Sequence, residues 1–128
     1  IRYFDREDRS RILNRLSEIV NAADVLYTSA EVCIFSDRPP LVANDGCVRL
    51  FEIARQEAGI LGRQLHPRKT GGGGDAAFAG IYPIPVLDGL GPEGENSHTE
   101  REYILVDSLS FKAELAVRII QKIMQGVV

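Results

Sequence analysis

Apolar residues recur at helical spacing in three stretches of the chain. Helices are predicted over residues 5–23, 44–59 and 108–125. Asp5, Asn44 and Ser108 can each cap the first turn with a side-chain oxygen. The apolar positions assigned to the core-facing sides are Ile12, Leu13, Leu16, Ile19 and Val20, then Val48, Phe51, Ala54 and Ala58, then Leu115, Ile119, Ile120 and Ile123.

Shorter stretches rich in β-branched, aromatic or apolar residues predict strands between these helices. The strands are expected at residues 1–4, 28–35, 63–67 and 85–87, with a short helix at 75–80 and a long loop at 89–102. Helices and strands that alternate in this way indicate an α/β fold. Pro39 and Pro40 end the second predicted strand, so we place a domain boundary there, between residues 1–40 and 41–128.

The first 40 residues form only a β-α-β unit, which cannot cover both faces of its sheet. We therefore expect this chain to be a truncated part of a longer protein, and to associate with the missing part or with another copy. The chain also opens at Ile1 on a strand-like run, without an initiator Met or a leader pattern.

Composition narrows the class of protein. The net charge of -3 and the absence of a basic stripe argue against nucleic-acid binding. No apolar run reaches the roughly 20 residues that span a bilayer, so we expect a soluble, cytoplasmic protein. Cys33 and Cys47 lie among apolar neighbours, where two reduced, half-buried thiols are the simplest interpretation.

Four consecutive glycines, Gly71 to Gly74, suggest a backbone that closely approaches a ligand. Backbone N–H groups before the following short helix favour an anion such as a carboxylate or phosphate. The Lys-Ser/Thr pair of a nucleotide phosphate loop is missing, so nucleotide binding is disfavoured. A flexible turn without a ligand is the alternative.

Three further residues are candidates for binding. His98 follows a predicted buried strand in a polar loop, where it could ligate zinc with Glu102 holding its other ring nitrogen, although a surface histidine is the alternative. Arg2 and Arg38 flank the strands of the first unit and could each grip a carboxylate bidentately, or be solvated. His66, beside Pro67, is expected to be structural.

Three motifs occur in order along the chain. They are Thr70-Gly-Gly-Gly-Gly-Asp75-Ala-Ala-Phe, Ile84-Pro-Val-Leu-Asp-Gly-Leu-Gly-Pro92 and His98-Thr-Glu-Arg-Glu-Tyr-Ile-Leu-Val-Asp-Ser-Leu109. Together they resemble the zinc peptidases and amidohydrolases that include glutamate carboxypeptidase, aminoacylase and succinyl-diaminopimelate desuccinylase. The resemblance implies a C-terminal part of the family's α/β catalytic domain, preceded by half of its ferredoxin-like α+β lid, which often mediates dimerisation.

The resemblance also implies roles for individual residues. His98 matches the last histidine ligand of two bridged zinc ions. The backbone N–H of Gly73 and the side chains of Arg2 and Arg38 match groups that bind the substrate carboxylate, and Glu102 matches a glutamate placed behind the ligand. Gly74 stands where the family usually has Ser or Thr, so a side-chain hydroxyl of that turn is absent here.

The family's His-x-Asp motif, its Glu-Glu pair with the general base and a further acidic ligand are not found here. We therefore expect the complete protein to hydrolyse an amide or peptide bond next to a free carboxylate, in a small peptide or N-acyl amino acid. This chain alone should be inactive. The alternatives are a non-catalytic carboxylate-binding or dimerisation module, and an α/β domain whose glycine loop is only a turn.

Overall fold

A computed structural model describes residues 1–22 and 25–126 as two compact units. Unit 1 is Ile1–Val42 with Thr70–Tyr82, and unit 2 is Ala43–Lys69 with Pro83–Val128. The glycine loop at 71–74 thus groups with the first 42 residues. The boundary near Pro40 concerns the domains of a complete protein and stays a prediction. Each unit is described by itself.

Unit 1 is built on helix α1 (Arg6–Asn21). As predicted, Asp5 caps it, and the Asp5 carboxylate accepts the backbone N–H of Asp8 at 2.7 Å. The predicted helix end near Ala23 lies outside the described residues. No residue of α1 is fully buried, because its apolar stripe has only partial cover within the unit.

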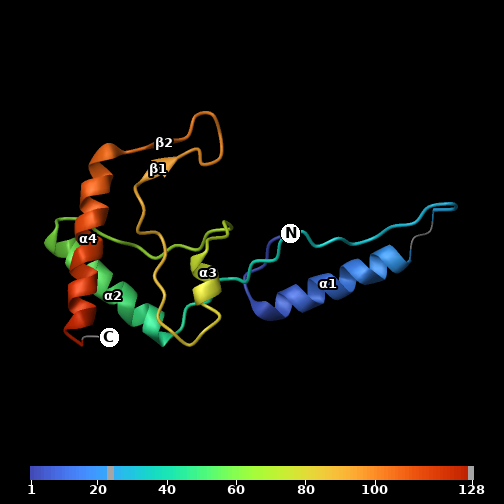
Figure 1. Cartoon of the computed structure of the whole chain (residues 1–128), viewed down its shortest axis with the longest axis horizontal. Helices are drawn as coiled ribbons and strands as arrows, with labels where there is room; N and C mark the ends of the chain where they lie inside the picture. The colour runs from blue at the N-terminus through green and yellow to red at the C-terminus, as the bar shows by residue number, and fades with distance from the viewer. Residues whose placement is uncertain (23–24, 127–128) are drawn as a thin grey trace. The chain divides into compact units, whose positions relative to one another are not determined.

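The two strands predicted in unit 1 are wrong. Residues 1–4 and 28–35 have no strand pairing, although the second segment runs back along α1 (Figure 1). Alternation of apolar and polar residues predicts extended backbone, but a strand also needs a hydrogen-bonding neighbour, and the described residues provide none. The short helix after the glycine loop is confirmed as α3 (Ala76–Ala79).

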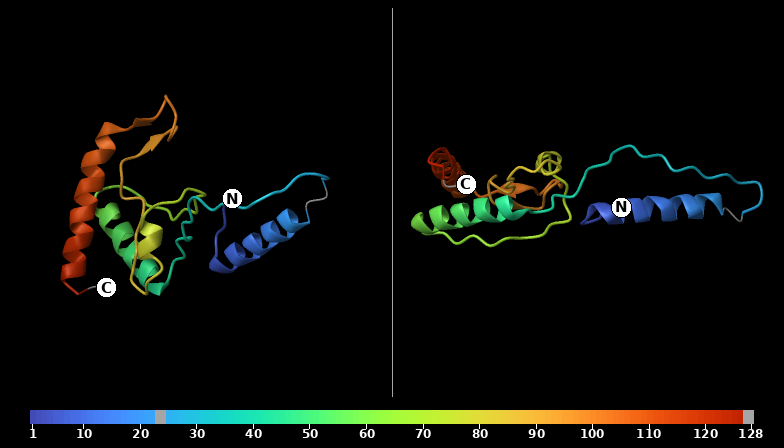
Figure 2. Two further views of the ribbon diagram at one scale, coloured as in Figure 1. Left: turned by 45° about the vertical axis from the view of Figure 1, so that its right-hand side comes forward. Right: turned by 90° about the horizontal axis from the view of Figure 1, so that it is seen from below.

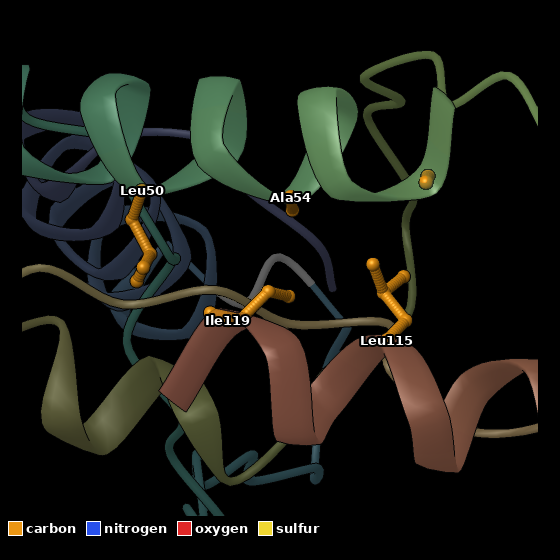
Figure 3. Close-up of a cluster of buried hydrophobic side chains, with 5 residues drawn as sticks. Leu50, Ala54, Leu115 and Ile119 are labelled. Carbon is orange, nitrogen blue, oxygen red and sulfur yellow. The ribbon is translucent and has the colours of Figure 1, made fainter. Parts of the chain in front are cut away.

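Unit 2 is centred on two helices, α2 (Asp45–Ile60) and α4 (Val106–Met124), which pack against each other. Their contact contains the main apolar cluster, shown in Figure 3 and formed by Leu50, Ala54, Ala58, Leu115 and Ile119. The predicted core positions Ala54, Ala58, Leu115 and Ile119 are confirmed. Val48, Ile120 and Ile123 are exposed instead, because the buried stripe follows the crossing of α2 and α4.

Charged groups also join α2 to α4. The buried Glu57 carboxylate lies 3.6 Å from Arg118 Nη1 and 3.8 Å from Lys122 Nζ. Asn44 caps α2 as predicted and accepts the backbone N–H of Cys47 at 2.9 Å. Helix α2 continues past Gly59 and ends at Ile60, so the predicted end at Gly59 is wrong.

A short hairpin, β1 (Gly94–Glu95) with β2 (Tyr103–Ile104), leads into α4 (Figure 2). A Cβ on Gly94 would lie 2.1 Å from the carbonyl oxygen of Tyr103, so only glycine allows this close pairing. The sequence predicted a loop here, because a two-residue strand has no periodicity.

The remaining predictions for unit 2 need correction. Residues 63–67 and 85–87 are not strands, since no neighbouring strand pairs with them among the described residues. Ser108 lies inside the first turn of α4 rather than at its cap, where Leu105 stands. Its hydroxyl accepts the Glu93 N–H at 2.8 Å and donates to the Leu105 carbonyl at 2.5 Å. His66 is exposed outside any strand.

The thiols differ from the expected pair of half-buried groups. Cys47 is buried and its Sγ accepts the Val86 N–H at 3.3 Å, whereas Cys33 is exposed. Unit 2 is helix-rich with a two-stranded sheet, which is compatible with part of an α/β protein. Within the described ranges, no helix is long and apolar enough to cross a membrane.

Candidate functional site

Unit 1 brings both predicted carboxylate-binding arginines against the glycine loop. A Cβ built on Gly71 would lie 2.8 Å from Arg2 Nη1, and one built on Gly73 would lie 3.4 Å from Arg38 Cδ. Arg2 and Arg38 are far apart in sequence, yet both side chains contact the same four-residue loop. Glycine at 71 therefore leaves room for a guanidinium that any larger residue would displace.

Arg38 is oriented by residues that follow the loop. Its Nη1 donates to the Asp75 carboxylate at 2.9 Å, and its Cζ lies 6.0 Å from the Phe78 ring centroid. Both partners of the Arg38–Asp75 pair are largely exposed, so the pair contributes little to stability. A guanidinium has five N–H donors, and Asp75 uses one of them, which leaves the Nε–Nη2 edge for a second carboxylate.

A side-chain network ties together the two segments that carry the arginines. The Tyr3 hydroxyl lies 2.9 Å from Asp37 Oδ1 and 2.9 Å from the Arg38 carbonyl oxygen. Arg9, on α1, donates from Nε to Asp37 Oδ2 at 2.7 Å and also from Nη2. The Arg9 and Tyr3 hydrogen bonds hold the pKa of Asp37 below its usual range. Burial, followed by the nearby Asp37 carboxylate, raises the pKa of Tyr3.

His98 belongs to unit 2, in the turn between β1 and β2. Its backbone is left-handed, with φ of 67°, and Asn96 is also left-handed with φ of 60°. The turn is closed by Thr99, whose N–H and hydroxyl both donate to the Asn96 carbonyl, at 3.1 and 2.8 Å. Left-handed backbone is unusual for a residue other than glycine and is enriched at functional sites.

Glu102 supports this turn through the backbone of His98. Its carboxylate accepts the His98 N–H at 3.2 Å, a contact the sequence did not predict. The hydrogen bond predicted between Glu102 and the second ring nitrogen of His98 stays a prediction. Across residues 1–22 and 25–126, no three His, Cys, Asp or Glu side chains gather closely enough to hold a metal ion. His98 can therefore contribute one ligand to a metal site but not a complete set.

Sequence reasoning missed Tyr3, Asp37, Arg9 and Gly94. Nothing in the spacing of Tyr3 and Asp37 could have paired them, since their contact depends on how the segment after α1 returns. Arg9 lies one turn beyond the Asp5 cap, in a run of charged residues that is typical of a solvated helix face. Gly94 had no signal beyond being one of several glycines in a loop.

Comparison with known proteins gives one family and one curated relative. Residues 12–122 match the model of Peptidase family M20/M25/M40. Carboxypeptidase G2 from Pseudomonas sp. (strain RS-16) is 28% identical over an alignment of 131 positions, which covers 98% of this chain and 31% of the relative. This chain thus spans about a third of that relative's length. No solved structure matches the chain. Because the family model covers most of its residues, the chain belongs to Peptidase family M20/M25/M40.

Proposed function

We propose that this chain is the C-terminal portion of a two-zinc metallopeptidase or amidohydrolase. The complete protein would hydrolyse an amide or peptide bond next to a free carboxylate, in a small peptide or an N-acyl amino acid. Membership of the family supports peptidase or amidohydrolase activity. The name of the similar carboxypeptidase G2 supports cleavage beside a terminal carboxylate.

The observation that carries the proposal is the gathering of Arg2 and Arg38 on the glycine loop. Both guanidinium groups lie in unit 1 beside Gly71 and Gly73. Two arginines and exposed backbone N–H groups form a set of donors that suits a carboxylate. The Nε–Nη2 edge of Arg38 matches the two oxygens of that group, and the Asp75 contact at Nη1 orients this edge.

The proposed metal chemistry requires residues outside this chain. Peptidases of this family are generally zinc-dependent, and zinc would polarise the scissile carbonyl and activate water. The exposed imidazole that His98 can present on its turn suits one zinc ligand. The roles of this chain would therefore be to bind the carboxylate through unit 1 and to present His98 through unit 2.

The direct test compares two substrates of the complete protein that differ in one group. An N-acyl amino acid with a free carboxylate should be hydrolysed at least ten times faster, in kcat/KM, than its carboxamide, on the scale of one charged hydrogen bond. Equal kcat/KM values for the free acid and the carboxamide would contradict carboxylate binding by Arg2 and Arg38. A complete protein that binds the free acid without hydrolysing it would instead support the non-catalytic binding module.

The role of His98 has its own test. In the complete protein, His98→Ala should remove about one of two zinc ions per subunit, measured by plasma emission, and nearly all activity, because a zinc site seldom tolerates the loss of a ligand. His66→Ala is the matched control, since His66 is also exposed but carries no proposed role. Retention of both zinc ions in His98→Ala would remove His98 from the site.

A further inference from the structure

Arg2 and Arg38 each have a sequence neighbour in the hydrogen-bond network formed by Tyr3 and Asp37. Tyr3 follows Arg2 directly in the chain, and Asp37 precedes Arg38. The Tyr3 hydroxyl lies 2.9 Å from both Asp37 Oδ1 and the Arg38 carbonyl oxygen. A bond between residues 3 and 37 therefore fixes the separation of the backbones that carry the two arginines.

In the described part of the chain, the Tyr3 hydroxyl makes the only hydrogen bonds that join residues 1–5 to residues 36–40. Residues 1–5 and 36–40 lack backbone–backbone hydrogen bonds, and neither segment is helical or paired as a strand. The hydroxyl proton of Tyr3 can be donated to only one acceptor at a time, so Asp37 and the Arg38 carbonyl share it. Exposed backbone of this kind would otherwise move freely.

Arg9 connects the network to a rigid element. It is the fourth residue of α1, and its guanidinium binds one oxygen of Asp37 while Tyr3 binds the other. These hydrogen bonds to a charged acceptor are stronger than neutral ones. The lowered pKa of Asp37 indicates that its ionised form is the one that is stabilised.

We infer that Tyr3, Asp37 and Arg9 form a staple that positions Arg2 and Arg38 for the substrate carboxylate. The staple residues do not touch the substrate; they act by holding the two arginines at the spacing that one carboxylate needs. This inference rests on the proposed function, and it adds three residues on which the preference for free acids depends.

The test uses the complete protein and the same free-acid and carboxamide substrates. Asp37→Asn should reduce kcat/KM for the free acid by about 3- to 10-fold, mainly through KM, because a net hydrogen bond is of that size. The carboxamide, which does not use the arginines, should change by less than about twofold. Tyr3→Phe should act in the same direction. Arg9→Gln should resemble Asp37→Asn, and Arg9→Lys should restore part of the loss because it keeps the charge.

Two controls separate this inference from its alternatives. Arg15→Gln also removes an ion-paired arginine of α1, the partner of Glu18, and should leave both substrates unchanged. In an Arg38→Ala background, Asp37→Asn should have little further effect. If Asp37→Asn and Tyr3→Phe slow both substrates equally, the network is merely structural and the inference is wrong. If Arg38→Ala and Arg2→Ala leave the free-acid preference intact, the proposed function itself fails.

Discussion

At the scale of single residues, Gly71 and Gly94 each leave room for a group that a Cβ would approach too closely. Gly94 lies against the backbone of Tyr103, and Gly71 lies against the side chain of Arg2. A side chain added at the two positions would have different consequences. The backbone of Tyr103 cannot move away from a new Cβ, whereas the end of the Arg2 side chain can. Substitution at Gly94 should therefore damage folding, and substitution at Gly71 should damage binding.

Gly71→Ala should weaken free-acid substrates without lowering stability much. The new Cβ would lie 2.8 Å from Arg2 Nη1, so the guanidinium must move away from the loop. We expect KM for the free acid to rise by about 3- to 10-fold, the scale of a net hydrogen bond, with little change in the thermal midpoint. Gly72→Ala is the matched control, since the nearest atom there is Thr70 Oγ1 at 3.8 Å. Equal effects of the two substitutions would show that the loop conformation, not Arg2, is responsible.

At the scale of elements, sequence patterns predicted the helices and failed for the strands. Asp5 and Asn44 were recognisable caps, and the spacing of Leu115 and Ile119 placed the buried face of α4. A helix satisfies its hydrogen bonds within itself, so local pattern is enough. The predicted strands, such as residues 28–35, depended on partners that no local pattern reveals.

The candidate site likewise combines residues that the local sequence reveals with residues that depend on long-range contacts. The glycine run and His98 stood out in the sequence. Arg2 and Arg38 were candidates because they flank predicted strands, and the family resemblance then implied that both bind one carboxylate. The staple of Tyr3, Asp37 and Arg9 depends on a long-range contact that only the structure shows.

The α2–α4 contact supports a prediction about stability. Leu115 is fully buried between the two helices, so Leu115→Ala should lower the free energy of unfolding of the complete protein by about 2–5 kcal/mol. Val117→Ala removes an aliphatic side chain from the exposed side of the same helix and should cost less than about 1 kcal/mol. Chemical denaturation monitored by circular dichroism measures both. Similar losses at both positions would contradict the assigned core.

At the scale of the whole molecule, unit 1 exposes much apolar surface. Tyr27 is 99% exposed and Phe35 is 97% exposed, and no residue of α1 is fully buried. Within the described part of the chain, residues 29–35 form no backbone–backbone hydrogen bonds with another strand. Exposed apolar groups next to an unpaired edge favour association. We therefore propose that unit 1 meets either a second copy of the chain or another part of the complete protein.

The isolated chain should consequently associate rather than remain a stable monomer. Sedimentation equilibrium at micromolar concentration should give a mass well above 14.1 kDa. Phe35→Ser with Val32→Ser should reduce the association, whereas Val117→Ser on α4 should not. A compact monomer with one cooperative thermal transition would contradict this proposal.

The central claim is that Arg38 recognises a carboxylate through the fork of its guanidinium. The most direct measurement is kcat/KM of Arg38→Lys in the complete protein, for a free-acid substrate and its carboxamide. Lysine keeps the charge but loses the bidentate geometry, so the free acid should lose about 10- to 150-fold, corresponding to about 1.5–3 kcal/mol for a charged hydrogen bond. The carboxamide should be nearly unaffected. Wild-type rates for the free acid in Arg38→Lys, or equal losses for both substrates, would contradict the account.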